Sequence, residues 1–324
     1  MRVTAHSPVP APSTTVTRVR AIAPGGVGNI GPGLDILGLA VTGLHDEVIA
    51  ERHDGRGVVV LDAGHPDIPA DPGRHSSAIA AAAVARRAGV PDAAIAIRLV
   101  KGLPLSGGQG GSAASSVAGA VAADALLGAG LDTNSLLECA LEAESANSGR
   151  HADNIAPILL GGICLVRSMD PLDVIPLPVP ATLRVVLALP AQRLRTSEAR
   201  AVLPATLPRA LALHQAAQVA AMVAAFASGD LELLRRSVDD RIAEPARATL
   251  IPGFAAAKAA ALEAGALGCS ISGAGPTAFA FAAGDDEAFL VAEAMRAGYA
   301  SAGVEATTRV AEIDTRGTVA AVLT

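Results

Sequence analysis

The glycine-rich segment at residues 104–116, PLSGGQGGSAASS, constrains the fold more than any other stretch of the chain. It follows an alternating run at residues 95–101 that predicts a half-buried strand, and it precedes an alanine-rich run that predicts a helix. A strand that passes through glycines into a helix start gathers free backbone N–H groups and the positive end of the helix dipole around one concavity. This arrangement favours an anion site, most often one for phosphate.

The alternative is an ordinary flexible turn, because glycine and serine also mark plain loops. Two features favour the phosphate site: the glycines adjoin the helix start, and no charged side chain interrupts the run. The segment does not match G-x-x-x-x-G-K-[ST], since no lysine follows its last glycine, and it lacks the spacing of G-x-G-x-x-G. A nucleotide-binding family with a different loop is therefore indicated.

Length and charge narrow the class of protein. A chain of 324 residues with 51% hydrophobic residues can bury a large core, and its length predicts two domains. A net charge of −6, with the charged residues scattered along the chain, argues against a nucleic-acid partner. The composition therefore predicts a soluble globular enzyme whose affinity for phosphate is local.

Cysteine usage and hydropathy predict the compartment. The cysteines at positions 139, 164 and 269 are widely spaced in apolar runs, which is typical of reduced core thiols in a cytoplasmic protein. The longest apolar run, at 210–227, contains His214, Gln215 and Gln218, and it would make a poor membrane span. No apolar signal core opens the sequence, so export is not expected.

The distribution of prolines predicts the domain boundaries. Residues 1–15 hold three prolines and several Ser and Thr residues, and we expect a mobile tail there. Residues 16–170 are expected to form an N-terminal, ATP-binding domain, which ends at a proline-rich connector beginning near residue 168. Residues 171–324 mix strands and helices, which predicts a small α+β sandwich as the C-terminal domain.

Two further segments carry candidate polar groups. The glycine-rich stretch APGGVGNIGPGLD at 23–35 places Asn29 and Asp35 in a bend, although both types also form turns through Asx hydrogen bonds. Residues 150–154 supply Arg150, His151, Asp153 and Asn154 just before an apolar run that we expect to be a strand. Such density suggests a site wall, and the alternative for His151 is a loop histidine bonded to backbone. Without a second His or Cys at ligand spacing, a zinc site is excluded.

One acidic residue lies on a predicted apolar helix face. Ser135 and Glu138 fit a capping box, and in the helix they begin, Glu144 shares a face with Leu137 and Leu141. A carboxylate on a buried stripe has to be paired, protonated or bound to a metal. A buried Glu–Arg pair and a metal ligand are equally compatible with this observation.

Four segments, in order along the chain, resemble motifs of the GHMP small-molecule kinases, the family of galactokinase and the homoserine, mevalonate and phosphomevalonate kinases. They are NIGPGLDILG, the glycine-rich segment at 104–116, HADNIAPILLGG and SISGAGPTAFA. The segments TSEARAVLP and IAEPARATLIPGF resemble the homoserine branch. Together these segments cover the chain from about residue 16 to its C-terminus.

The resemblance implies an α+β fold. Its N-terminal domain would be like the second domain of ribosomal protein S5, its C-terminal domain would be ferredoxin-like, and ATP would lie between them. It implies the reaction ATP + L-homoserine → ADP + O-phospho-L-homoserine, a step of threonine biosynthesis, with Mg²⁺ as cofactor, and we expect a homodimer. The alternatives are another acceptor such as mevalonate or shikimate, a GHMP homologue without turnover, and an NAD-binding dehydrogenase. The sequence lacks the glycine spacing and the following acidic residue that a dehydrogenase needs.

The resemblance also implies roles for individual residues. Ser112 and Glu144 would hold Mg²⁺, and both would be catalytic together with Thr196. Asp35 with Asn29 would take the substrate ammonium, Arg200 and Arg247 its carboxylate, and Asp153, Asn154 and Thr196 its hydroxyl, beside His151. The ATP-binding loop would comprise Pro104, Leu105, Ser106, Gly107, Gly108, Gln109, Gly110, Gly111, Ser112, Ala113 and Ala114.

The loop departs from the family motif P-x-G-x-G-L-G-S-S-A-A-S. Ser106 stands where the family has Gly, and Gly111 stands where it has the first Ser. Since glycine still supplies its backbone N–H, the loss of a hydroxyl at 111 is expected to be tolerable. Gly111→Ser is then expected to tighten ATP binding modestly by reducing loop entropy, provided that φ at this position is not positive.

Overall fold

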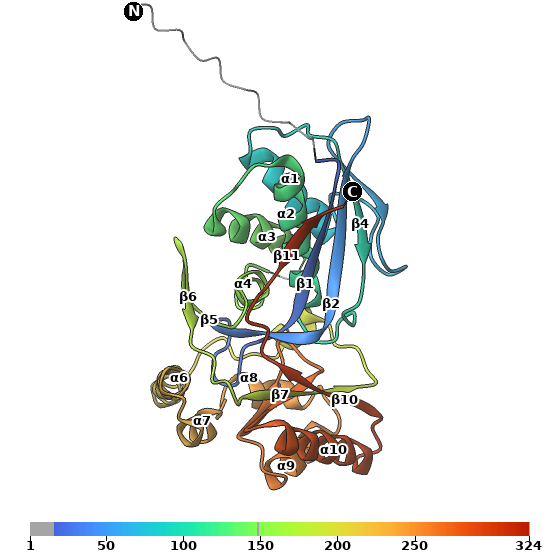
Figure 1. Ribbon diagram of the computed structural model, residues 1–324. Helices are drawn as coiled ribbons and strands as arrows, with labels where there is room; N and C mark the ends of the chain where they lie inside the picture. The colour runs from blue at the N-terminus through green and yellow to red at the C-terminus, as the bar shows by residue number, and fades with distance from the viewer. Residues whose placement is uncertain (1–15, 148, 324) are drawn as a thin grey trace, which may run out of the picture.

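The computed structural model describes residues 16–147 and 149–323, so the expected tail at 1–15 lies outside the described residues. A seven-stranded sheet forms the upper part of Figure 1, with the order β11-β1-β2-β4-β3 and with β5 and β6 joined to it through β2. Its strands are β1 (Arg18–Gly28), β2 (Leu37–Arg52), β3 (Val58–Asp62), β4 (Ile95–Val100), β5 (Ile163–Met169), β6 (Leu172–Leu177) and β11 (Val319–Val322).

Four helices pack on this sheet and enclose the first core. They are α1 (Ser76–Arg87), α2 (Gly111–Leu127), α3 (Thr133–Asn147) and α4 (Ile155–Leu160). Helix α2 is almost entirely buried, because its alanines and small residues let it approach β1, β2 and α1 closely. Gly119 is one such point, since a Cβ there would lie 2.4 Å from the Ser77 carbonyl oxygen. The predicted strand, glycine loop and helix around residues 95–127 are therefore confirmed.

A four-stranded antiparallel sheet forms the lower part of Figure 1, in the order β10-β7-β9-β8. The helices at 254–263 and 285–301 pack on these strands, and the chain order of the strands is the split βαβ pattern of the expected ferredoxin-like domain. The strands are β7 (Arg184–Pro190), β8 (Gly268–Ile271), β9 (Ala278–Ala282) and β10 (Ala306–Glu312). The helices are α5 (Thr196–Ala201), α6 (Arg209–Ser228), α7 (Leu231–Ser237), α8 (Ala243–Ala248), α9 (Phe254–Glu263) and α10 (Asp285–Ser301).

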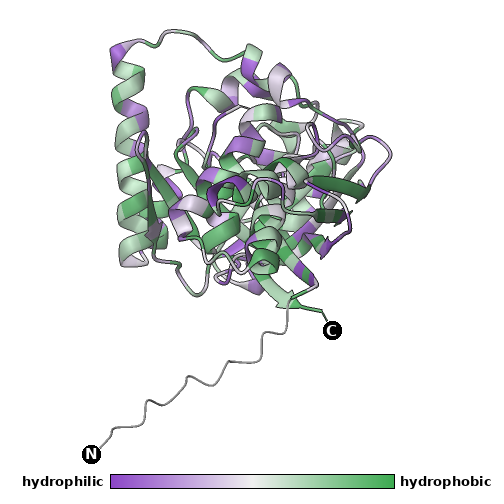
Figure 2. Ribbon diagram, turned by 90° about the horizontal axis from the view of Figure 1, so that it is seen from above, coloured by the Kyte–Doolittle hydropathy of each residue, from purple (hydrophilic) through white to green (hydrophobic). Residues whose placement is uncertain are grey.

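One hydrophobic cluster joins the two halves. It contains Val27 and Leu37 from the first sheet, Phe279 and Phe281 from β9, and Phe226 from α6. Figure 2 shows hydrophobic residues in helices and strands across the molecule, including the long helix at its left edge. Because this cluster is shared, the two sheets are held together by buried apolar surface, which positions any site between them.

The course of the chain differs from the expected division at residues 170/171. That position falls inside the β5–β6 hairpin, whose register pairs Met169 with Leu172, so β6 still belongs to the first sheet. The C-terminal strand β11 also returns to the first sheet and pairs antiparallel with β1. The second sheet therefore starts only at β7, and the last described residues lie beside the first strand.

Two local predictions were wrong. The apolar run after Asn154 is not a strand but the short helix α4, with Pro157 in its first turn, where a missing N–H costs little. Helix α3 begins at Thr133, and the carboxylate of Asp132 accepts a hydrogen bond from Ser135 N at 2.7 Å. Asp132 is thus the N-cap, and Ser135 lies inside the first turn rather than capping it.

Cysteines and hydropathy add two observations. Cys139, Cys164 and Cys269 are free and buried as expected, and burial raises the pKa of each thiol. In the part of the chain that the structure describes, α6 is long and apolar enough to cross a membrane, judged by length and composition alone. Helices of soluble proteins meet the same test, so this is weak evidence for a membrane span.

Candidate active site

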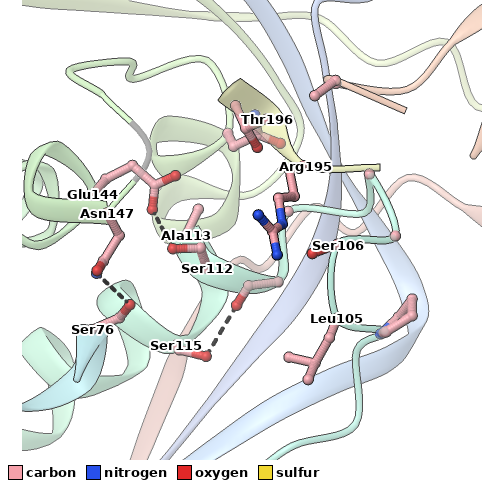
Figure 3. Close-up of a pocket in the computed structure, with 18 of the residues that line it drawn as sticks. Ser76, Leu105, Ser106, Ser112, Ala113, Ser115, Glu144, Asn147, Arg195 and Thr196 are labelled. Carbon is pink, nitrogen blue, oxygen red and sulfur yellow. Dashed lines mark hydrogen bonds between the residues drawn. The ribbon is translucent and has the colours of Figure 1, made fainter. Parts of the chain in front are cut away.

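A cavity of about 910 Å³ brings together residues from both halves of the molecule. It lies at the N-terminus of α2, beside α3 and α5, and Figure 3 shows Ser106, Ser112, Glu144 and Thr196 around it. Its lining includes most of the predicted site residues, namely Asn29, Pro104, Leu105, Ser106, Gly107, Gly108, Gly110, Gly111, Ser112, Ala113, Glu144, His151, Asp153, Asn154, Thr196, Arg200 and Arg247.

Three predicted residues do not line the cavity. Asp35 is connected to it through a contact with His151 and an ion pair with Arg200. The side chain of Gln109 is used in contacts with the second half of the chain, since its Nε2 donates to Thr277 Oγ1 at 3.3 Å and its Oε1 accepts from Arg309 Nη2 at 3.0 Å. Ala114 is fully buried within α2.

The carbonyl groups of the phosphate loop, residues 104–114, are anchored by the second half of the chain. Thr277 Oγ1 donates to Gly107 O at 2.5 Å, Ser272 Oγ donates to Gly108 O at 2.6 Å, and Leu194 N donates to Ser106 O at 3.4 Å. Gly108 fits against this turn because a Cβ there would lie 2.7 Å from two carbonyl oxygens. With its carbonyls held from behind, the loop can turn its N–H groups towards the cavity.

The first turn of α2 supplies the anion-binding end of the cavity. Gly110 is its N-cap with φ +70°, and no acceptor among the described residues takes up the N–H groups of Gly111, Ser112 or Ala113. The first N–H groups of a helix have no intrahelical partner and attract anions. Ser106, which replaces a family glycine, has φ +51°, a conformation that glycine adopts more readily.

Ser112 and Glu144 meet beside this helix start. Ser112 Oγ donates to Glu144 Oε2 at 2.7 Å, and Figure 3 shows the two side chains pointing towards each other. Glu144 is half-buried rather than fully buried, so it lies at the edge of the apolar face of α3. A hydroxyl and a carboxylate are the hard oxygen donors that Mg²⁺ accepts, and the pair therefore fits the expected metal site.

At the other end of the cavity, Asp35 and Arg200 form a two-pronged ion pair. Arg200 Nη2 donates to Asp35 Oδ1 at 2.7 Å, and Nη1 donates to Oδ2 at 3.3 Å. His151 Nδ1 lies 3.2 Å from the same Oδ1. A group of each charge is thus held in one place, as recognition of a zwitterion requires.

Arg247 lies next to this pair and is only 2% exposed. Its Nε donates to Ala199 O at 3.1 Å and its Nη1 donates to Gly273 O at 2.9 Å, so α8 is tied to α5 and to the turn before β9. Within residues 16–147 and 149–323, no carboxylate lies within ion-pair distance of it. Burial, and secondly the charge of Arg200, lowers the pKa of Arg247. The cavity therefore holds a buried cation without an anionic partner.

Asn29 and Asp153 support the same wall. Asn29 Oδ1 accepts from Asp35 N at 2.9 Å, Nδ2 donates to Gly273 O at 2.7 Å, and its backbone N donates to Asp153 Oδ2 at 3.0 Å. Both polar atoms of the Asn29 carboxamide thus bond to backbone groups. Asn29 therefore forms a turn, which was the alternative to a ligand-binding role in the sequence analysis. Gly28 makes the wall possible because a Cβ there would lie 2.5 Å from Asp153 Oδ2.

The two carboxyl groups have opposite pKa shifts. Burial, reinforced by the nearby charge of Asp35, raises the pKa of Asp153 to about 6. Burial also acts to raise the pKa of Asp35, but hydrogen bonds from His151 and Arg200 outweigh it and hold that pKa well below its usual value. At neutral pH Asp35 is a fixed anion, whereas Asp153 is a carboxylate basic enough to accept a proton.

Comparisons with known proteins identify the family of the chain. The family model described as "GHMP kinases N terminal domain" matches residues 73–162, and the model "GHMP kinases C terminal" matches residues 222–301. The homoserine kinase of Chlorobium phaeobacteroides is 40% identical over 290 residues, covering 86% of this chain and 91% of that protein. The chain belongs to the GHMP kinase family.

Other relatives of this GHMP kinase are also named homoserine kinase. The homoserine kinase of Arabidopsis thaliana is 39% identical, covering 88% of this chain and 79% of that protein. The crystal structure of homoserine kinase from Cytophaga hutchinsonii superposes with a TM-score of 0.91 at 38% identity, covering 97% of this chain and all of that one. Lactococcus lactis galactokinase, at 16% identity and a TM-score of 0.69, shares the fold alone. The expected GHMP fold is confirmed.

Sequence reasoning missed two residues at the site of this kinase. They are Lys101 and His75, which both line the cavity. His75 is fully buried, its ring nitrogens make no hydrogen bonds among the described residues, and burial lowers its pKa. One hint of the importance of Lys101 was present in the sequence. The chain has only two lysines among its 25 Lys and Arg residues, so a lysine beside the glycine-rich segment is unusual.

The pKa of Asp153 predicts how this kinase depends on pH. Because its pKa of about 6 in the folded protein exceeds the 3.8 of a free aspartate side chain, its contribution to stability is full below pH 3.8 and is lost as pH rises through 6. Asp153→Asn, which cannot ionise, should therefore gain up to about 3 kcal/mol relative to wild type between pH 4 and pH 8. Urea unfolding of both proteins at the two pH values measures this difference.

Asp35→Asn should show a pH dependence of stability with the opposite sign, and at more acidic pH. Its pKa is lowered on folding, so the stability it contributes is present above the unfolded value and is lost as pH falls. Asp35→Asn should therefore lose stability relative to wild type at both pH 8 and pH 4, and this loss should shrink only as the pH falls below 3.8, the unfolded value. If the stability difference for Asp153→Asn were the same at pH 4 and pH 8, the raised pKa would be wrong.

Proposed function

We propose that this GHMP kinase transfers the γ-phosphoryl group of ATP to the side-chain hydroxyl of L-homoserine, giving ADP and O-phospho-L-homoserine. The choice of an amino acid as the phosphoryl acceptor rests on three charged residues. The buried guanidinium of Arg247, which has no carboxylate partner among the described residues, lies next to the ion pair of Arg200 and Asp35. An amino acid brings one carboxylate and one ammonium to such a place. The names of the relatives point to the same substrate.

Binding of the substrate would rearrange these charges. The α-carboxylate would be held by Arg247 and Arg200, and the ammonium would take the place of Arg200 beside Asp35. Asp153, Asn154 and Thr196 line the same cavity as Arg247, Arg200 and the phosphate loop. They would orient the hydroxyl towards the phosphates, and Asp153, with its raised pKa, is the carboxylate suited to accept the hydroxyl proton.

The nucleotide would occupy the other end of the cavity. The N–H groups of the first turn of α2 would bind its phosphates, and the apolar end near Ile68, Pro69 and Leu99 would take the nucleoside. Ser112 and Glu144 would hold Mg²⁺, which neutralises charge on the transferring phosphoryl group. Positioning and charge neutralisation supply most of the catalysis in such reactions.

A coupled assay of ADP release with homoserine, serine, mevalonate, shikimate and galactose tests the proposal. Homoserine should give the highest kcat/KM, because mevalonate and shikimate offer a carboxylate without an ammonium, and serine has one methylene fewer between hydroxyl and carboxylate. A preference for mevalonate or shikimate would instead assign the chain to another GHMP activity. Absence of turnover with all acceptors, together with measurable ATP binding, would favour the non-catalytic homologue.

We infer a cytoplasmic enzyme without nucleic-acid or membrane partners from the scattered acidic charge and the reduced, buried cysteines. A homodimer is inferred from the resemblance to the family. Light scattering after size exclusion tests the oligomeric state, and flotation with lipid vesicles tests the membrane.

A further inference from the structure

The ammonium group of Lys101 lies directly beneath the first turn of α2. It donates to Asp46 Oδ2 at 2.5 Å, to Gly111 O at 2.8 Å and to Ser115 Oγ at 3.2 Å. The side chains of Lys101 and Asp46 are 5% and 0% exposed. An ammonium has three N–H bonds, so every donor of Lys101 is used inside the protein.

Asp46 extends this contact to the other end of the loop. Its Oδ1 accepts from Gly102 N at 3.2 Å and from Leu103 N at 3.0 Å, where β4 leads into the loop. Its Oδ2 accepts from Ser115 Oγ at 2.7 Å, and Ser115 directly follows the last residue of the loop. The Lys101–Asp46 pair therefore binds the entry and the exit of the phosphate loop to one point on β2.

Gly111 leaves the space in which this pair sits. A Cβ at position 111 would lie 2.9 Å from Lys101 Nζ, closer than real Cβ contacts. The backbone of Gly111 is helical, so a positive φ does not explain the glycine. The end of a lysine side chain usually moves easily. Here it cannot move without breaking a buried ion pair, which leaves a charge uncompensated.

We propose that Lys101 and Asp46 are positioning residues that fix both ends of the phosphate loop, and that position 111 is glycine because their ion pair fills the space of its side chain. Lys101 acts through the loop, since its donors are committed to protein acceptors. The proposal rests on the proposed role of the loop in binding ATP. It reverses the expectation from sequence, because any side chain at 111 would displace the pair and loosen the loop.

The first test is Gly111→Ala, which adds a Cβ without a hydroxyl. The Kd of MgATP, measured by calorimetry without homoserine, should rise roughly fivefold or more. A change of this size corresponds to the interaction energies measured between residues in direct contact. The KM of homoserine should stay within about twofold, because the acceptor end does not touch this pair. Gly73→Ala is the matched control, since Gly73 has no positive φ and a Cβ there makes only an ordinary contact at 3.5 Å.

The second test repeats Gly111→Ala in a background where the pair is neutral, Lys101→Met with Asp46→Asn. Without the ammonium the added Cβ has room, so Gly111→Ala should change the Kd of MgATP by less than about twofold. The same fold-increase in both backgrounds, or no increase in wild type, would overturn the proposal. The turnover of homoserine by the wild-type protein is measured separately. That measurement tests the proposed function independently of the four Kd values compared here.

Lys101→Arg keeps the test decisive if the neutral background does not fold. It retains the positive charge but places a wider head group against the helix start. Positioning predicts that it raises the Kd of MgATP as Gly111→Ala does, and that the two changes combine less than additively. An unchanged Kd would show that only the charge of Lys101 matters, which contradicts the proposal.

Discussion

Replacing Glu144 by glutamine is expected to lower kcat by about two orders of magnitude or more, because metal neutralisation of the transferring phosphoryl group supplies several kcal/mol. The fold should persist, since the glutamine oxygen can still accept the hydrogen bond that Ser112 Oγ donates at 2.7 Å. The affinity for ATP itself should change far less, because the backbone N–H groups of α2 remain. Initial rates across a Mg²⁺ titration, with calorimetry of ATP binding, measure both effects.

Glu142→Gln is the matched control for this change. Glu142 lies two residues earlier on α3, but it is exposed and pairs with Arg86 on the outer surface, away from the cavity. Its loss should leave kcat and the dependence on Mg²⁺ unchanged, since exposed ion pairs contribute little. A near-normal kcat for Glu144→Gln, or an equal loss for the two variants, would exclude Glu144 as a metal ligand.

The phosphate loop was predictable from sequence because its chemistry is local. A strand, a run of glycines and a helix start are read from consecutive residues, and backbone N–H groups need no distant partner. The wall around residues 150–154 was found for the same reason. In contrast, Lys101 and Asp46 are 55 positions apart, and Asp35 and Arg200 are 165 apart. Only the fold brings such pairs together, so a single sequence gives no sign that they touch.

The errors in the fold have equally physical causes. The run Ile155–Leu160 is short and apolar, and periodicity cannot separate a buried strand from one buried helical turn at that length. Strand β11 has four exposed residues and no alternation of burial, because it lies at the edge of the sheet. Its position depends on pairing with β1 rather than on its own sequence.

Arg247 carries the second large expected effect. Arg247→Leu should lower kcat/KM for homoserine by a factor that corresponds to about 2 to 5 kcal/mol of transition-state stabilisation, because the substrate carboxylate loses its partner in a desolvated site. The KM of ATP should change much less, since the phosphate loop lies at the other end of the cavity. The exposed Arg241, which pairs with Asp239, gives the control variant Arg241→Leu, and its kinetics should be those of wild type.

A substrate without a carboxylate separates this clamp from a folding defect. Arg247 also donates to Ala199 O and Gly273 O, so its loss could displace α5 and with it Arg200. We therefore compare homoserine with 3-aminopropan-1-ol, which keeps the ammonium and the hydroxyl. In wild type, removal of the carboxylate should cost most of the 2 to 5 kcal/mol, and in Arg247→Leu it should cost little, because the partner is already gone. If the variant lost the same factor with both substrates, Arg247 would support the wall without binding the carboxylate.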